Sequence, residues 1–312
     1  MKLQDNNGCF KDNLSPQLPP CKGGGAAPLS FWRSVEGEAL CILFFVLFFS
    51  FSCLSQETPT SLTYKSILVG FGPSSVYDTY LSPLNYTGEN VGLYYEQTKN
   101  TGLLKGKVSA QHLFNANYSW SKNNTGTASY YSGVVEYDYG LHYRFTPANK
   151  WLFFAGMQAD GLAGFVYNTR NGNNPATGKA HVNLNLSGIA NYKLQIHKQP
   201  ILFRDQLGIP FIGAMYSPQY GESYYEIGLG DTKHLIHLSS FHNYLNFRNV
   251  LSAELPFNNF TLRFSYLFSF YETRINNLDT RMTSNTFYIG FSQNFFVVSE
   301  KHKKNNYRYV FE

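Results

Sequence analysis

The stretch Phe260–Tyr271 reads FTLRFSYLFSFY and alternates large apolar side chains with smaller or polar ones. The large residues at every second position are Phe260, Leu262, Phe264, Tyr266, Phe268 and Phe270. A β-strand would collect these six side chains on one face, whereas a helix would scatter them around its circumference. Thr261, Arg263, Ser265 and Ser269 occupy the opposite face. The stretch therefore predicts a β-strand with one apolar and one polar face.

The same alternation recurs through most of the chain after about residue 60. Short segments rich in Asn, Pro and Gly, such as 146–149 (TPAN) and 171–175 (NGNNP), separate the alternating runs and are typical of turns. We predict about ten strands and no long helix in this region. The expected strands are 62–72, 88–99, 106–121, 128–146, 151–168, 179–196, 201–216, 242–256, 260–275 and 284–298.

The expected strands are long. Several exceed a dozen residues, whereas an ordinary strand has about five or six. A tilted strand that crosses a membrane needs about 9–11 residues, and closing the sheet removes edges that lipid cannot satisfy. We therefore predict an all-β fold, a closed antiparallel transmembrane β-barrel of about ten strands, within a range of about eight to twelve. A soluble periplasmic β-sandwich or calyx is the alternative, but its outer face would carry more Lys and Glu than the Asn, Ser, Thr and Gly found here.

The composition is poor in charge and rich in aromatic residues. Charged residues make up 14% of the chain and aromatic residues 17%, whereas soluble domains average about 25% charged. Mean hydropathy is nevertheless −0.27, because uncharged polar residues fill the remaining positions. The net charge of +5 is small and the basic residues are scattered rather than gathered into a patch, which argues against nucleic-acid binding.

An apolar run over Ala39–Leu54 precedes the alternating region. Its length of roughly 16 residues is short for a membrane-spanning helix, which needs about 20. We predict a signal peptide over 35–55, cleaved between Ser55 and Gln56. Lipidation at Cys53 and an uncleaved helical anchor are the alternatives. Residues 1–34 are interpreted as a disordered extension from a mis-assigned start codon, and 56–312 as the barrel.

All four cysteines precede the expected cleavage site; they are Cys9, Cys21, Cys41 and Cys53. The mature protein would therefore contain no disulfide, no thiolate metal site and no cysteine nucleophile.

Four stretches resemble a family of predicted outer-membrane proteins from Bacteroidota bacteria, a family known only as a domain of unknown function. They are Ser66–Gly70 (SILVG), Asp78–Gly88 (DTYLSPLNYTG), Tyr220–Glu226 (YGESYYE) and Ser240–Asn243 (SFHN). The resemblance covers most of the chain from about residue 60 onward. It implies an outer-membrane barrel and supplies no activity.

Charged residues of both signs lie on the polar faces of the expected strands. We predict that they form a lumenal charge network of Glu136, Asp138, His142, Arg144, Asp160, Lys193, Arg248, Glu254 and Arg263. In a barrel of about ten strands such side chains reach one another across a narrow interior, so paired charges would plug it. A polar lining for a narrow passive channel is the alternative interpretation.

Two other groups of residues are candidate sites of chemistry. Ser240 and His242, with Asn246 following, have the spacing of a serine–histidine pair in a membrane-embedded lipid hydrolase. Extending the alternation of Arg248, Ser252 and Glu254 backward, however, places Ser240 and His242 on the lumenal face, where a lipid ester would not arrive. His234 and His237, with His242 nearby, are a second group. The i, i+3 spacing of the first two suits a helix where none is expected, and no carboxylate pair completes the set, so we predict no metal site there.

A long external loop is expected over 217–241, between the expected strands 201–216 and 242–256. Its candidate binding residues are Tyr220, Glu222, Tyr224, Tyr225 and Glu226, because loops carry function more often than walls do. We predict a protein of the bacterial outer membrane, structural or binding rather than enzymatic, with no cofactor and an unknown ligand. Its expected partners are outer-membrane lipid and the barrel-assembly machinery, with no nucleic acid.

Overall fold

The structure is a computed structural model that describes residues 62–148, 150–172, 174–196, 199–222, 227, 229, 235–257 and 260–296. The chain divides into two units, Met1–Ser55 and Gln56–Glu312, and every described residue belongs to the second. The predicted extension 1–34, the signal peptide 35–55 and the cleavage site at Ser55 and Gln56 lie outside the described residues. So do Tyr224, Tyr225, Glu226 and His234.

The described residues form eleven strands and one short 3-10 helix. The strands are β1 (Leu62–Asp78), β2 (Ser82–Asn100), β3 (Val108–Asn123), β4 (Ser129–Ala148), β5 (Trp151–Asn168), β6 (Ala176–Ile196), β7 (Gln199–Tyr216), β8 (Ile236–Ser240), β9 (Tyr244–Pro256), β10 (Thr261–Ile275) and β11 (Leu278–Phe296). The 3-10 helix, η3, spans Leu103–Gly106. No helix among the described residues is long and apolar enough to span a membrane.

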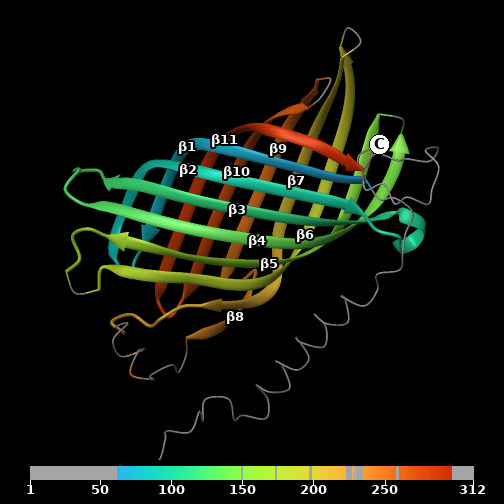
Figure 1. The fold of residues 1–312 in the computed structure, drawn as a ribbon. Coiled ribbons are helices and arrows are strands. Elements are labelled where there is room, and N and C mark those ends of the chain that lie inside the picture. The colour runs from blue at the N-terminus through green and yellow to red at the C-terminus, as the bar shows by residue number, and fades with distance from the viewer. Residues whose placement is uncertain are drawn as a thin grey trace, which may run out of the picture. The chain divides into compact units, whose positions relative to one another are not determined.

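The strands close into a ring (Figure 1). Each strand from β1 to β7 pairs with the next, β1 also pairs with β11, and β11, β10, β9 and β7 complete the circle. Every pairing is antiparallel. Ten strands make this ring, and β8 is added beside the second half of β7. The prediction of a closed antiparallel barrel of about ten strands is confirmed.

One seam of the wall is interrupted. Leu202–Gly208 of β7 pair with Arg248–Glu254 of β9, and Ile212–Tyr216 of β7 pair with Ile236–Ser240 of β8. A turn at 241–243 separates β8 from β9. Two short strands therefore share the place that one long strand takes elsewhere in the ring.

The first strands extend further than the sequence predicts. The expected range 62–72 ends at Gly72, just before Pro73, but β1 continues to Asp78. The expected range 88–99 begins after the true start of β2, which is Ser82. The β1–β11 register passes directly from the Phe71–Phe287 pair to the Ser74–Ser284 pair. The register is the same on both sides of this gap in the β1–β11 ladder, and Pro73 still pairs with Glu89 of β2. The gap accommodates Pro73, whose nitrogen cannot donate a ladder hydrogen bond.

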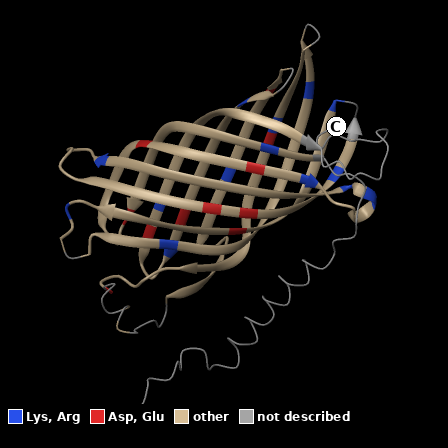
Figure 2. Ribbon diagram, in the orientation of Figure 1, with Lys and Arg blue, Asp and Glu red and all other residues tan. Residues whose placement is uncertain are grey.

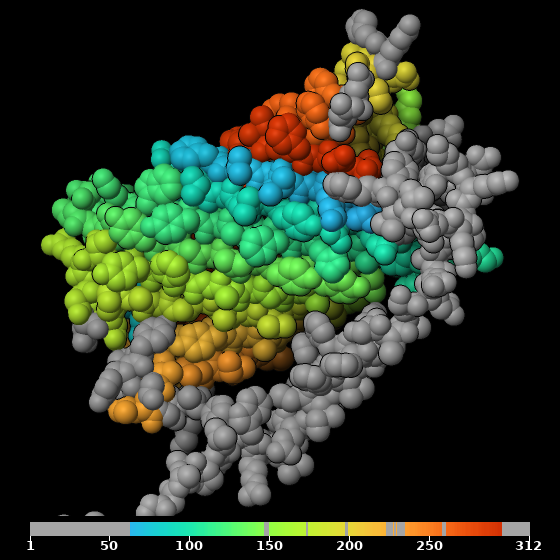
Figure 3. All heavy atoms as spheres, viewed as in Figure 1, coloured from blue at the N-terminus to red at the C-terminus, as the bar shows by residue number. Residues whose placement is uncertain are grey.

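The apolar face of the wall points outward. On β1, Ile67, Val69 and Phe71 are all at least half exposed, whereas their neighbour Leu68 is buried. Figure 3 shows side chains of β1 to β5 as a continuous layer on this outer surface. Most interior side chains are polar or charged, which is the reverse of a soluble core.

The two ends of the barrel differ. Leu62 and Phe296 pair at one end, termed here the terminal end, where the connections are 101–107, 149–150, 197–198 and 257–260. The opposite end, termed the loop end, carries 79–81, 124–128, 169–175, 217–235 and 276–277. The longest connection, 217–235, therefore lies at the loop end.

Candidate functional site

Charged residues of both signs lie along the strands of the wall (Figure 2). The strand alternation turns many of them into the interior, where they are buried. Inward positions of β4 are taken by Glu136, Asp138 and His142, and those of β9 include Arg248 and Glu254. All of them are buried. Because successive side chains of a strand face opposite sides, their alternate spacing in the sequence brings them to one face.

The first group of interior charges, termed the Glu96 cluster, consists of Tyr64, Glu96, Arg204, Glu254 and Arg263. The Glu96 carboxylate binds Arg204 Nη1 at 2.5 Å and Arg263 Nη1 at 2.6 Å, and all three residues are at most 2% exposed. Glu96 lies on β2 and Arg204 on β7, which are not neighbours in the ring. The bridge therefore crosses the lumen.

Arg263 uses its remaining donors on nearby hydroxyl groups. Its Nη1 donates to Tyr64 Oη at 3.0 Å and Ser66 Oγ at 2.9 Å, and its Nη2 donates to Ser252 Oγ at 3.0 Å. Tyr64 Oη in turn donates to Glu254 Oε1 at 2.5 Å. Two carboxylates and two guanidinium groups thus balance in this cluster.

Three glutamine side chains extend the network across the lumen. Gln111 Nε2 donates to Glu96 Oε1 at 2.9 Å and to Gln206 Oε1 at 3.0 Å. Gln158 Nε2 donates to Gln111 Oε1 at 3.2 Å. These residues lie on β3, β7 and β5, so their contacts fill the interior next to the Glu96 cluster.

The second group, termed the Arg248 cluster, consists of Glu136, Asp138, Asp160, His181 and Arg248. Arg248 Nη1 lies 2.5 Å from Glu136 Oε2, and its Nη2 lies 2.6 Å from Asp138 Oδ2. His181 Nε2 lies 3.0 Å from Asp160 Oδ2. Tyr244 Oη lies 3.1 Å from His181 Nδ1. The cluster joins β4, β5, β6 and β9.

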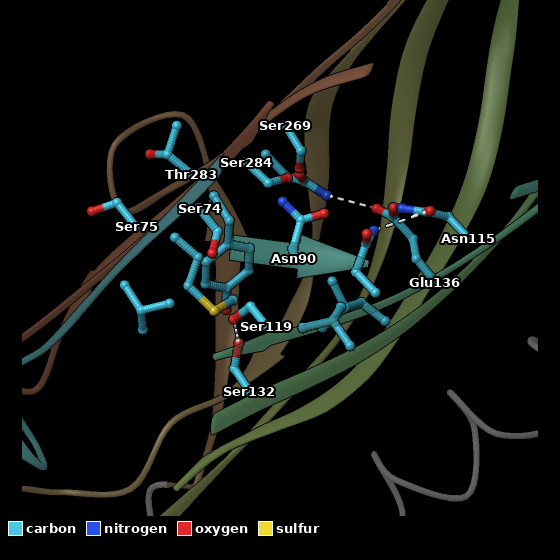
Figure 4. A pocket seen from close by; sticks show the side chains of 17 residues that line it. Ser74, Ser75, Asn90, Asn115, Ser119, Ser132, Glu136, Ser269, Thr283 and Ser284 are labelled. Atoms are coloured by element: carbon cyan, nitrogen blue, oxygen red, sulfur yellow. Dashed lines mark hydrogen bonds between the residues drawn. The ribbon is translucent and has the colours of Figure 1, made fainter. Parts of the chain in front are cut away.

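A small polar cavity of about 70 Å³ remains beside this cluster. Its lining includes Ser74, Asn90, Asn115, Ser119, Glu136 and Asn246, and Figure 4 shows several of these side chains converging on it. Asn246 Nδ2 donates to Glu136 Oε1 at 3.0 Å at its wall. By volume the cavity could hold about two water molecules at ~30 Å³ each.

Seven of the nine predicted network residues are buried members of the interior: Glu136, Asp138, His142, Asp160, Arg248, Glu254 and Arg263. His142 Nε2 lies 3.0 Å from Ser187 Oγ rather than in an ion pair. Arg144 is partly exposed and Lys193 is exposed, so these two are not buried parts of either cluster.

Sequence reasoning missed four charged interior residues and His181. Glu96 and Arg204 anchor the first cluster, and Lys179 Nζ forms a separate 2.8 Å pair with Asp78 Oδ2 near the loop end. The alternation of side chains along β2, β6 and β7 was the sequence signal that could have placed these residues inside the barrel. It was weak for Glu96, because large side chains such as Tyr86 and Tyr94 share its inward face.

The predicted lumenal placement of Ser240 is wrong. Ser239 points inward and donates to Asn183 Oδ1 at 2.5 Å, so Ser240 has the outward orientation of Ile236 and Leu238, which are well exposed. Ser240 Oγ lies 2.5 Å from Nδ1 of His242, which is exposed. The turn at 241–243 breaks the alternation, so counting back from Arg248 gives the wrong face. Asn246 binds Glu136 inside the barrel and is not the third member of this pair.

The described part of the 217–235 loop places two of its candidate residues at the surface. Tyr220 is 74% exposed. Glu222 Oε2 accepts a hydrogen bond from the Gln219 backbone at 2.9 Å, and its own carbonyl accepts one from Tyr80 Oη at 2.6 Å. His237 lies on β8 and contacts Asn276 Nδ2 at 3.1 Å.

Glu272 forms ion pairs with Arg274 and Arg281 at the loop end, beyond the outward apolar residues of β10. Glu272 Oε1 accepts from Arg281 Nη2 at 2.7 Å and from Arg274 Nη2 at 2.8 Å. The hydrogen bond from Arg281 lowers the pKa of Glu272 below its ordinary value, with a further contribution from Arg274. The carboxylate is therefore held in its charged form.

Residues 39–302 match the model of a family described as "Protein of unknown function (DUF3316)". The chain belongs to this family. The assignment agrees with the family of unknown function expected from the sequence, while a Bacteroidota origin stays a prediction. No curated protein matches the DUF3316 chain.

Solved structures similar to this DUF3316 protein share low sequence identity with it. The outer-membrane protease OmpT from Escherichia coli aligns with TM-score 0.42 and 9% identity over 78% of this chain and 99% of that chain. The translocator domain of autotransporter NalP from Neisseria meningitidis gives 0.38 and 8%, over 83% and 98%. The COG4313 outer-membrane channel from Pseudomonas putida F1 gives 0.34 and 8%, over 78% and 98%. The fold assignment rests on strand order and register, and these likenesses say nothing of activity.

Proposed function

We propose that this protein is an outer-membrane barrel with a sealed interior, acting as a structural or binding scaffold rather than as a diffusion channel. One observation carries the proposal. The Glu96 carboxylate binds Arg204 and Arg263 across the lumen, and all three residues are almost fully buried. A conducting pore would keep such groups in contact with water.

The outer surface supports a membrane location. Exposed apolar residues on the outward face, such as Val69, Phe165, Leu186 and Phe287, suit contact with lipid tails. The first strand begins and the last strand ends at the terminal end. The connections there are short, as at the periplasmic side of outer-membrane barrels. We propose that the loop end faces outward, and that outer-membrane lipid and the barrel-assembly machinery are the partners.

Conductance in planar bilayers tests the sealed interior. We expect the wild-type protein to give no stepwise current. A triple variant, Glu96→Ser with Arg204→Ser and Arg263→Ser, removes the bridge and should conduct. Of the charged groups in the cluster it leaves Glu254, which keeps its hydrogen bond from Tyr64. Glu89→Gln, on the exposed outer face of β2, is the control and should stay silent.

Heat-modifiable gel mobility establishes that each variant is a folded barrel before it is tested. Stepwise conductance by the wild-type protein, unchanged in the triple variant, would overturn the sealed interior and favour a narrow passive channel by another route.

A second candidate function, lipid hydrolysis, is supported by the Ser240–His242 contact. The 2.5 Å approach of Ser240 Oγ to His242 Nδ1 is the arrangement that activates a serine nucleophile. Its outward position beside Leu238 and Phe241, both more than half exposed, would allow a lipid ester to reach it.

Turnover of a fluorescent phospholipid by the refolded protein tests this second candidate. We expect Ser240→Ala to abolish turnover, whereas Ser239→Ala, on the opposite face of the same strand, should retain it. If the wild-type protein releases no fatty acid, or if Ser240→Ala is as active as wild type, lipid hydrolysis at this pair is excluded.

A further inference from the structure

Three interior side chains from neighbouring strands converge in the Arg248 cluster. Glu136 of β4, Asp160 of β5 and His181 of β6 each offer one ligand atom, and these atoms lie within 4.8 Å of one another. None of the three residues is more than 4% exposed. The sequence did not suggest this grouping, because it depends on the register between strands.

The charge around this point is not balanced by the described residues. Asp138 and Asp160 stand directly opposite each other across β4 and β5, and Glu136 shares their face. Arg248 pairs with Glu136 and Asp138, so with a neutral imidazole at His181 three carboxylates meet one guanidinium group. A protonated His181 would still leave one negative charge uncompensated.

The imbalance is local to the Arg248 cluster. In the Glu96 cluster two carboxylates meet two guanidinium groups, and Asp78 has its own partner in Lys179. Like charges directly opposite in a sheet are destabilising, and buried charges need compensation. With a neutral His181, a single divalent cation would bring the net charge of the Arg248 cluster to zero.

Unsatisfied atoms give a second, independent indication. Asp160 Oδ1 and Asp138 Oδ1 are buried and have no hydrogen-bond partner among the described residues. Both residues are only 1% exposed. Buried carboxylate oxygens without a partner are rare, because the lost hydration is costly. A metal ion would satisfy the free oxygen of Asp160, and the field of that ion would stabilise the free oxygen of Asp138.

We propose that Glu136, Asp160 and His181 bind a divalent transition-metal ion inside the barrel. Imidazole together with carboxylate oxygens suits ions such as Zn²⁺ or Mn²⁺, whereas Ca²⁺ and Mg²⁺ take oxygen ligands.

Neighbouring side chains are placed to orient the ligands. Tyr244 Oη contacts His181 Nδ1 at 3.1 Å, and Asn185 Nδ2 donates to Asp160 Oδ2 at 3.1 Å. Asn246 holds Glu136 in the same way. Such contacts fix the ring and carboxylates around a metal. The cavity next to Glu136 leaves room for water to complete the coordination shell.

Metal content and binding of the full-length, folded barrel test the proposal. The chelated protein is titrated with Zn²⁺ and with Mn²⁺ in detergent, with Mg²⁺ as the comparison ion, and bound metal is measured by mass spectrometry. We expect about one equivalent of transition metal and a rise in thermal unfolding temperature that a chelator reverses. Asp160→Asn and His181→Gln should each weaken binding by about 10-fold or more.

His142→Gln is the matched control, because His142 is also a buried lumenal histidine but lies outside the three-residue group. It should bind metal as the wild type does. Wild-type protein that takes up neither ion overturns the proposal whether or not the variants fold. Equal loss of binding in His142→Gln, or unfolding temperatures indifferent to metal, overturns it as well.

Discussion

Substitution of Glu96 should destabilise the interior strongly, because its one carboxylate holds two buried guanidinium groups. Glu96→Gln would leave Arg204 and Arg263 without their shared counter-charge, and breaking a buried ion pair costs about 3–5 kcal/mol. We expect a lower urea midpoint for unfolding in detergent. Glu89→Gln, on the outer face, should change the free energy of unfolding by no more than about 0.5 kcal/mol. Equal midpoints for the two variants would contradict this prediction.

Glu272 gives a pH-dependent contribution at the loop end. Its pKa is lowered in the folded protein by Arg281 and Arg274, so the contribution is present above the unfolded pKa and is lost as pH falls through the folded value. We expect Arg281→Ala to be less stable than wild type near neutral pH. The difference should disappear well below the ordinary pKa of 4.5. Thermal unfolding of both proteins across this pH range is the measurement, and a difference that grows in acid would refute it.

Residue-level prediction from the sequence succeeded where alternation alone decides the face of a side chain. Arg248 and Arg263 were placed inside because they stand on uninterrupted strands. The Asp160–His181 contact could not be foreseen, because it requires the register between β5 and β6. Ser240 was placed on the wrong face because the turn at 241–243 is not visible in the alternation.

At the scale of the strands, Gly156 marks a close approach between β4 and β5. A Cβ there would meet the backbone of Leu141 and His142, so Gly156→Ala should force the strands apart and cost about 1–3 kcal/mol. Gly188 on β6 has open space around its Cβ position. Gly188→Ala should instead be neutral or stabilise the barrel by up to about 1 kcal/mol. Chemical unfolding of the two variants measures the change in the free energy of unfolding. An equal loss of stability in Gly156→Ala and Gly188→Ala would contradict this prediction.

The sequence predicted which segments form strands better than it predicted where those strands begin and end. Long alternating runs identified the ten wall positions, since lipid on one side and polar residues on the other impose a period of two. The end of β1 was missed because Gly72 and Pro73 resemble a turn. They lie within a strand that has no pairs with β11 at these two positions but stays paired with β2. Strand β8 lay inside the expected loop 217–241, where a five-residue strand gives little alternation.

For the whole molecule, the proposed orientation can be tested with single cysteines. The natural cysteines all lie before residue 56. Tyr220→Cys at the loop end and Leu104→Cys at the terminal end replace side chains that are 74% and 65% exposed. On intact cells a membrane-impermeant maleimide should label the first and not the second, whereas both should react after permeabilisation. Labelling of Leu104→Cys alone on intact cells would mean that the barrel is inserted the other way.

The interrupted seam between β7 and its neighbours also affects how the wall would come apart. Seven residue pairs join β7 to β9 and five join it to β8, whereas every other junction of the ring has at least thirteen. Backbone amides along this junction should exchange with deuterium before those of the longer ladders, because fewer hydrogen bonds must open together. Under a pulling force the cylinder would therefore split along β7, which lies within the chain, and not where the first and last strands meet.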